Sequence, residues 1–160
     1  MKVGWIGVGN MGKPMAKHIQ EHVSEFTVCD LNQEAAIDIL EDGGIWAETP
    51  AECAKDKDVV FMSLPMPQDV EKVSIGESGI IESVKKTNRV VACEEGFPQY
   101  GIGAEISARI TEQAFDWLDA PIARVAAADV PLPYAANLEA LALPQTTQIQ
   151  NAAKAVCYRA

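Results

Sequence analysis

The sequence predicts an α/β fold with a Rossmann-like, mostly parallel sheet and helices on both of its faces. Short apolar runs alternate with helical segments along the 160 residues, which is the pattern of successive βαβ units. A glycine-rich segment at residues 7–12 follows the first apolar run directly and opens the first helix. A chain of this length corresponds to about one domain and can bury a core without disulfides or metals.

Apolar periodicity and cap residues set the elements of the first half. Strands are expected at residues 3–7, 26–30 and 58–64, the last of them as a buried strand, and helices at residues 11–23, 33–41, 68–73 and 80–86. Asn32 is the expected N-cap of the helix at 33–41, which Gly43-Gly44 ends. Thr49 caps a further short helix that has Pro50 at its first position.

In the second half, a buried strand is expected at residues 89–93. An amphipathic helix follows at residues 104–115, with Ile106, Ile110 and Ala114 on its apolar stripe. Short strands are expected at residues 117–118 and 122–125, then a packed, proline-rich loop at 130–134. Helices at residues 137–143 and 145–158 come last.

The net charge of −10 bears on the choice of partners. An acidic field of this size repels nucleic acid and anionic lipid headgroups, so neither is expected as a partner.

The four cysteines match no zinc spacing and are expected to be buried free thiols, which suits a reducing compartment. We find no signal peptide and no apolar stretch that could span a membrane, so a cytoplasmic location is expected.

The glycine-rich segment has the pattern G-x-G-x-x-G of dinucleotide-binding loops. Its residues are Gly7, Val8, Gly9, Asn10, Met11 and Gly12. The first glycine permits a tight turn, the second lets a pyrophosphate approach the backbone, and the third lets the helix pack closely on the strand. The helix N-terminus then offers free N–H groups to the phosphates. The alternative is a βαβ unit with a glycine turn and no ligand.

Asp30 lies 18 residues after Gly12, at the end of the second expected strand, where such sites place a ribose-binding acid. Its carboxylate can accept hydrogen bonds from the adenine ribose and would repel a 2′-phosphate. The next residues, Leu31, Asn32 and Gln33, supply no arginine to offset that repulsion. The sequence therefore favours NAD over NADP.

Three other patterns have simpler explanations. His18 and His22 lie four residues apart on the first helix, and a metal would need a third and usually a fourth ligand. Glu21 and Glu25 are close in sequence but form no ligand pattern, so solvated histidines are expected. Gly101-Ile102-Gly103 precedes a helix, but Glu105 would compete with a phosphate there, so a plain turn is expected. Glu94-Glu95 ends a strand and could be an acid/base pair. Neighbouring strand residues point to opposite faces, however, so only one of the two can face a given cleft.

The first half resembles a known family. Residues 3–16 read VGWIGVGNMGKPMA, which closely resembles the N-terminus of the β-hydroxyacid dehydrogenases, the family of 3-hydroxyisobutyrate and 6-phosphogluconate dehydrogenase. The resemblance continues at residues 28–32, 58–65 and 76–80. It implies an NAD-binding half over residues 1–82 and places Leu64, Pro65 and Met66 beside the cofactor.

The resemblance ends before the catalytic parts of that family. Ile122-Ala123-Arg124 replaces the serine-glycine-glycine that would follow Asp119-Ala120-Pro121. The motif G-x-x-x-G-x-G-x-x-x-K, which carries the catalytic lysine, does not occur. Lys154 is the one lysine after Lys86, and it matches nothing.

The second half is similar to the C-terminal, transketolase-like domain of the pyruvate dehydrogenase beta subunit. The similar segments are residues 82–91, 94–99, 101–106, 115–121, 128–139 and 156–159. One departure is Ala126-Ala127, where that family usually has threonine-glycine. The resemblance implies subunit contacts over residues 83–160, with no thiamine diphosphate site in this chain.

The chain thus combines two family fragments joined near residues 80–84, and either one continuous sheet or two domains could form there. Its function would be that of an NAD-binding, oxidoreductase-related protein, and whether it is itself an enzyme stays open. The alternatives are a non-catalytic assembly module of a pyruvate dehydrogenase complex, or no settled function. Expected partners are the dinucleotide and either a second copy of the chain or a pyruvate dehydrogenase alpha subunit.

Overall fold

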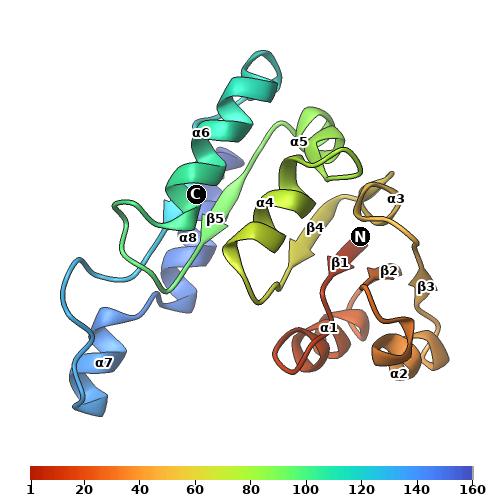
Figure 1. The fold of residues 1–160 in the computed structure, drawn as a ribbon, viewed down its shortest axis with the longest axis horizontal. Helices are drawn as coiled ribbons and strands as arrows, with labels where there is room; N and C mark the ends of the chain where they lie inside the picture. The colour runs from red at the N-terminus through yellow and green to blue at the C-terminus, as the bar shows by residue number, and fades with distance from the viewer. Residues whose placement is uncertain (160) are drawn as a thin grey trace. The chain divides into compact units, whose positions relative to one another are not determined.

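The computed structural model describes residues 1–159. The chain divides into two compact units, one spanning Met1–Thr87 and the other starting at Asn88. The division falls close to the family seam expected near residues 80–84. Figure 1 follows the elements of both units along the chain.

The first unit is built on a four-stranded sheet in which every paired neighbour is parallel. Its order is β3-β2-β1-β4, and the strands are β1 (Lys2–Ile6), β2 (Glu25–Cys29), β3 (Ile45–Trp46) and β4 (Val59–Met62). The helices are α1 (Gly12–Gln20), the 3₁₀ turn η1 (Gln33–Ala36), α2 (Ile37–Glu41), α3 (Pro50–Ala54), α4 (Pro67–Ile75) and α5 (Ile81–Thr87). The expected α/β, Rossmann-like fold is confirmed.

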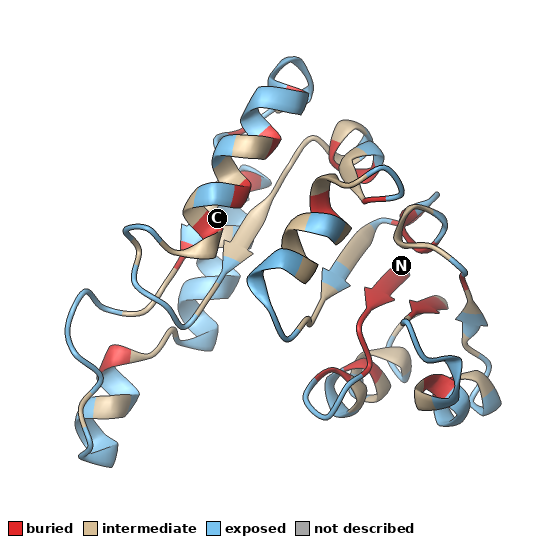
Figure 2. Cartoon of the chain, viewed as in Figure 1, coloured by how far each residue is buried: buried red, intermediate tan, exposed pale blue. Residues whose placement is uncertain are grey.

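Helices cover both faces of this sheet. Successive strand residues point to opposite faces, and two separate apolar clusters form as a result. One cluster joins Val3 and Val28 of the strands to Ala16 of α1 and Ile39 of α2. The other joins Ile6 and Cys29 to Cys53 of α3, with Val73 of α4 packed against it. The two central strands, β1 and β2, are therefore buried along almost their whole length (Figure 2).

The strand order reverses beside β1. The chain runs from β1 outward through β2 to β3, and then returns to the other side of β1 as β4. Such a reversal opens a crevice at the carboxyl ends of the two strands that flank it, and ligands bind there in doubly wound sheets. Two backbone bonds, each 2.9 Å, fix the end of β1. Gly7 N–H donates to the Cys29 carbonyl of β2, and Ser63 N–H, directly after β4, donates to the Ile6 carbonyl of β1.

The expected helix caps are confirmed. The Asn32 side chain accepts from Glu34 N–H at 3.1 Å, and Thr49 Oγ1 accepts from Glu52 N–H at 3.2 Å. The helix expected at 33–41 begins with the 3₁₀ turn η1 before it becomes α2. Gly43 then adopts a left-handed φ of +88°, which accounts for the stop.

The strand expected to be buried at residues 58–64 is instead a partly exposed edge strand. Within residues 1–159, β4 pairs only with β1, and Phe61 is 39% exposed. A parallel strand is covered fully only where it has neighbours on both sides and helices on both faces. Its apolar composition therefore indicated the strand correctly but not its place in the sheet.

The second unit contains a separate sheet of two parallel strands, β5 (Val91–Cys93) and β6 (Ala123–Val125). Its helices are α6 (Ile102–Ala114), the 3₁₀ turn η2 (Phe115–Trp117), α7 (Ala136–Ala142) and α8 (Thr146–Val156). The buried stripe of α6 is the expected one, Ile106, Ile110 and Ala114. Of the two arrangements left open for the seam, the described residues form two sheets, not one continuous sheet. No helix within residues 1–159 has the length and apolarity needed to cross a membrane.

Three expectations for this unit are wrong. Residues 117–118 are not a strand, because the chain turns as η2 with Leu118 N–H bonded to the Phe115 carbonyl. The strand expected to be buried at residues 89–93 spans Val91–Cys93 and is only partly covered, since its sheet has two strands. The proline-rich loop does not pack, and the Tyr134 side chain is fully exposed.

The cysteines divide into two kinds. Cys29 and Cys53 are buried, as expected, whereas Cys93 and Cys157 are exposed. Burial, with Asp30 adding to it, raises the pKa of the Cys29 thiol to about 11. Burial also raises the pKa of the Cys53 thiol to about 12, and partial burial raises the pKa of Cys93.

Iodoacetamide at pH 8 should therefore label two cysteines in the folded chain and four in denaturant, since the thiolate is the reactive form. Peptide mapping should find Cys157 labelled first and Cys93 labelled more slowly.

The raised pKa values of the buried thiols also mean that the folded chain keeps protons which the unfolded chain releases near pH 9. Stability should be full below pH 9 and should fall as the pH rises toward 11. Rapid labelling of Cys53 in the folded chain would contradict this assignment.

Candidate functional site

The turn after β1 can be made only by glycine. Gly7 has a left-handed φ of +92°. A Cβ at this position would lie 2.2 Å from the backbone oxygen of Ser63 and 3.0 Å from the Leu64 side chain. Both the backbone angle and the close approach of the segment after β4 therefore require the first glycine of the motif.

The third glycine of the motif is fixed by a similar contact. Gly12 begins α1, and a Cβ there would lie 2.1 Å from the carbonyl oxygen of Gly7. This close packing brings the N-terminus of α1 directly against the turn. It is the helix–strand contact that the spacing of the motif predicts.

The middle of the loop is open. A Cβ at Gly9 would meet nothing within 4 Å, and Gly9 and Asn10 are exposed. Within the described chain, the amides of Gly9, Asn10 and Met11 have no hydrogen-bond acceptor. α1 has no side-chain cap and no acidic residue in its first turn. This cradle of free N–H groups at the positive end of a helix fits a pyrophosphate.

Asp30 joins the end of β2 to this loop. Its Oδ2 accepts from Val8 N–H at 2.7 Å, and its Oδ1 accepts from Asn32 N–H at 2.9 Å. The amide of Val8 is therefore used within the protein and is not available to a ligand. Each carboxylate oxygen keeps a further lone pair that a ribose hydroxyl can use.

Sequence analysis missed one residue that shapes the loop, Trp5. It is buried in β1, as a core tryptophan should be, but its Nε1–H also donates to the Gly7 carbonyl at 2.8 Å. A buried indole N–H needs an acceptor, and Trp5 lies on a strand two residues before the turn. A tryptophan on a buried strand, two residues before the turn, is therefore the sequence signal for a side chain that bonds the Gly7 carbonyl.

The remaining predicted site residues surround the loop unevenly. Leu64 lies against Gly7 and is half-buried, whereas Pro65 and Met66 are exposed at the start of α4. Leu31 is fully exposed, and Met11 is 73% exposed. The structure thus brings Gly7–Gly12, Asp30 and Leu64 together and leaves the side chain of Leu31 in solvent.

Gly101 and Gly103 in the second unit are required for a different reason from the glycines of the loop at residues 7–12. Gly103 N–H donates to Glu94 Oε1 at 3.1 Å. A Cβ at Gly101 would lie 2.4 Å from this carboxylate, and a Cβ at Gly103 would lie 2.5 Å from it. The N-terminus of α6 is therefore covered by the protein's own carboxylate. This agrees with a plain turn at this position, although Glu94, not Glu105, is the acid that occupies it.

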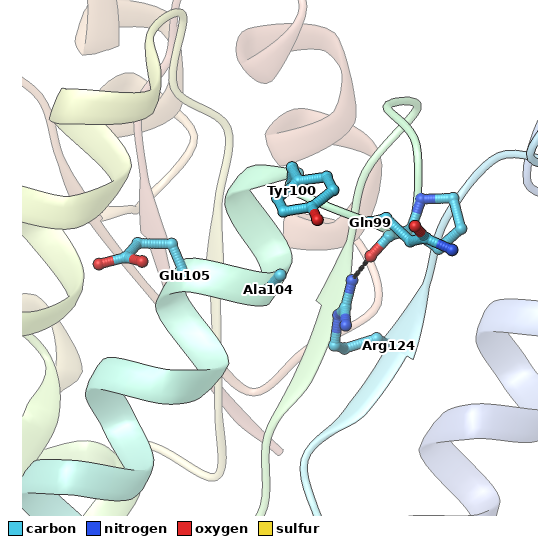
Figure 3. Close-up of a pocket in the computed structure, with 7 residues that line it drawn as sticks. Gln99, Tyr100, Ala104, Glu105 and Arg124 are labelled. Atoms are coloured by element: carbon cyan, nitrogen blue, oxygen red, sulfur yellow. Dashed lines mark hydrogen bonds between the residues drawn. The ribbon is translucent and has the colours of Figure 1, made fainter.

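A hollow near this turn is shown in Figure 3. Its lining residues are Pro98, Gln99, Tyr100, Gly101, Ala104, Glu105 and Arg124. The Arg124 guanidinium donates to the Pro98 carbonyl, and Glu105 points away from it (Figure 3). Arg124 thus holds the loop after β5.

The fold and the glycine cradle define a dinucleotide-binding domain of the Rossmann type. The chain matches the model of the NAD binding domain of 6-phosphogluconate dehydrogenase over residues 2–130. It therefore belongs to this family, as the resemblance of its first half predicted.

Curated relatives carry a second name. The chain is 62% identical over 78 residues to a pyruvate dehydrogenase E1 beta-1 subunit of Oryza sativa subsp. japonica, a match covering 49% of this chain and 21% of the relative. It is 50% identical over 104 residues to the corresponding beta subunit of Rhizobium meliloti (strain 1021), covering 65% and 21%. The matched segment thus spans about a fifth of these relatives. The family match and these matches together exceed the chain length, so they share part of the chain.

Solved structures agree on the fold. An imine reductase from Myxococcus stipitatus is similar in a variant complexed with NAD+ (TM-score 0.56, 16% identity, covering 78% of this chain and 39% of that one). The same enzyme is similar in its complex with NADP+ (0.53, 16%, 79% and 40%). A 3-hydroxyisobutyrate dehydrogenase from Mycobacterium tuberculosis is similar at a TM-score of 0.51 and 17% identity, covering 79% and 39%. At these identities the likeness concerns the fold.

Proposed function

We propose that the first unit binds NAD, with the pyrophosphate on the amides of Gly9, Asn10 and Met11 and the adenine ribose on Asp30. The observation that carries this proposal is the uncovered N-terminus of α1 beside an open Gly9. Membership of the NAD-binding family supports it. When bound, the nicotinamide would supply the hydride acceptor of an oxidoreductase.

The choice of NAD over NADP rests on charge. Asp30 presents a carboxylate at the end of β2, where a 2′-phosphate would have to lie. Leu31, Asn32 and Gln33 provide no cation to offset the repulsion. The carboxylate is anchored by two backbone amides, so it cannot easily turn away from an incoming phosphate.

Four further residues near the loop would have positioning roles in this proposal. Leu64, Pro65 and Met66 would flank the cofactor at the end of β4, and Trp5 would hold the Gly7 carbonyl in place. No residue is assigned to proton transfer or substrate binding, so turnover would need groups from outside these 160 residues. NAD binding is therefore the activity proposed for the chain itself.

Calorimetric titration of the chain with NAD tests the proposal. Binding on the order of micromolar is expected, and Gly9→Asp should abolish it, because its carboxylate would project into the phosphate cradle. Gly9 has no neighbour within 4 Å, so the variant should fold and melt as the parent does. Undiminished NAD binding by a folded Gly9→Asp variant would refute the assignment, as would no binding by the parent. NADP should bind more weakly than NAD.

A second candidate function follows from the 62% identity to pyruvate dehydrogenase beta subunits. Here the second unit would act as a non-catalytic assembly module of a 2-oxoacid dehydrogenase complex. Co-purification with a pyruvate dehydrogenase alpha subunit, undiminished in Gly9→Asp, would support it. The two functions are separable, because one is lost in that variant and the other is not.

A further inference from the structure

Three side chains with metal-binding atoms meet at the C-terminal end of α1. His18, Glu21 and His22 are exposed, and one ligand atom of each lies within 4.8 Å of the others. The two imidazole rings already touch, with centroids 5.3 Å apart and planes at 83°. Residues three and four positions apart share a helix face, and the end of α1 extends this geometry to His22.

We infer that His18, Glu21 and His22 form a binding site for a divalent transition metal of the zinc class. Two imidazoles and one carboxylate are a donor set that Zn²⁺ accepts, with water in the fourth position. The calcium and magnesium ions prefer oxygen donors and would gain little from the imidazoles. The site is independent of the proposed dinucleotide cradle, which lies at the opposite end of the same helix.

The side chains are free to close on a metal. Zinc bonds of about 2.0–2.2 Å require the three ligand atoms to move closer together. In the part of the chain that the structure describes, no hydrogen bond or ion pair holds any of these side chains elsewhere. Rotation of exposed side chains is sufficient for the approach, and it would rearrange the ring contact between the histidines.

The backbone beneath the side chains is held on both sides. Gln20 Nε2 donates to the carbonyls of Ile39, at 2.8 Å, and Asp42, at 3.2 Å. Ser24 N–H donates to the Met1 carbonyl at 3.0 Å. The segment that carries the ligands is therefore ordered before a metal arrives, which lowers the entropy cost of binding.

The local field favours a cation. The carbonyl end of a helix carries partial negative charge, and the whole chain has a net charge of −10. The Lys17 ammonium is paired with Asp42 at 3.0 Å; this hydrogen bond first, and the charge of Glu21 among others, raise the pKa of Lys17. Within residues 1–159, Glu21 itself forms no ion pair. Because all three ligands are exposed to water, we assign binding to this site and no reaction.

Calorimetric titration of the full, untagged chain with ZnCl₂ tests the inference. One zinc per chain is expected, and His18→Ala or His22→Ala should each weaken binding by at least about tenfold, since even outer residues of metal sites cost that much. The chain has two histidines, so their ring-proton resonances should both shift on titration. Glu21→Gln should weaken binding less than either histidine substitution, because the amide oxygen is a weaker donor.

Two controls separate this site from other cation-binding groups. The Cys93→Ser/Cys157→Ser variant removes the exposed thiols and should bind zinc as the parent does. Mg²⁺ should bind far more weakly than Zn²⁺. Zinc binding that disappears with the thiols, or that survives both histidine substitutions, would overturn the inference, and so would equal binding of Mg²⁺. Gly9→Asp should leave zinc binding unchanged, so failure of the NAD proposal is recognisable separately.

Discussion

Gly7→Ala should destabilise the first unit by about 3 kcal/mol or more, because it combines a left-handed backbone with a steric overlap. The added Cβ would lie 2.2 Å from the Ser63 backbone oxygen, and Ser63 is itself bonded to the end of β1 through its N–H and the Ile6 carbonyl. Relief would require the two strand ends to separate. Thermal or urea unfolding followed by circular dichroism measures the loss.

Substitutions at two other glycines separate the cost of backbone strain from the cost of steric overlap. Gly43 has a similar φ of +88° but no neighbour within 4 Å, so Gly43→Ala should cost only the backbone strain, about 1 kcal/mol. Gly9 has neither a left-handed φ nor a close neighbour, so Gly9→Ala should leave stability almost unchanged. If Gly7→Ala cost no more than Gly43→Ala, the proposed contact with Ser63 would be wrong.

Asp30→Asn should weaken NAD binding by about tenfold or more and lower stability by about 1–3 kcal/mol, although it removes only a charge and replaces one oxygen. Both carboxylate oxygens accept backbone N–H groups, from Val8 and Asn32. An amide has one oxygen, so its NH₂ group must face one of these donors. The ribose also loses an ionised acceptor, which forms the stronger hydrogen bonds.

Asp58→Asn is the matched control. Asp58 also accepts a backbone amide, from Lys2 at 2.7 Å, but through one oxygen only. The asparagine amide can turn its oxygen toward that donor, so the control should lose little stability and no NAD affinity. Unchanged NAD affinity in a folded Asp30→Asn variant would exclude the ribose contact. Equal losses in both variants would show that the double acceptance by Asp30 is unimportant.

The elements and contacts that could be predicted from the sequence are those fixed by local chemistry. The loop at residues 7–12 follows from glycine spacing between a strand and a helix, and the caps at Asn32 and Thr49 follow from side chains that bond amides two or three residues away. Asp30 was located by its distance along the chain from Gly12. In the structure its carboxylate accepts from Val8 N–H in the loop, a contact that the spacing did not predict.

Features that depend on distant neighbours could not be predicted in this way. Whether an apolar strand such as β4 lies inside a sheet or at its edge depends on strands far away in the sequence. The approach of Glu94 to Gly101 and Gly103 likewise requires the packing of β5 beside α6. The exposure of Cys93 depends on how few strands surround it. Apolar composition alone gives no information on any of these three.

The position of Asp30 between two backbone amides limits how the cofactor preference of this fold can change. Asp30 braces the turn through these two bonds, and in the proposed site the same side chain would also select the nucleotide. A mutation that merely removed the acid to admit NADP would loosen that turn at the same time. A viable switch would need a second substitution to restore the brace, so the two traits should evolve together.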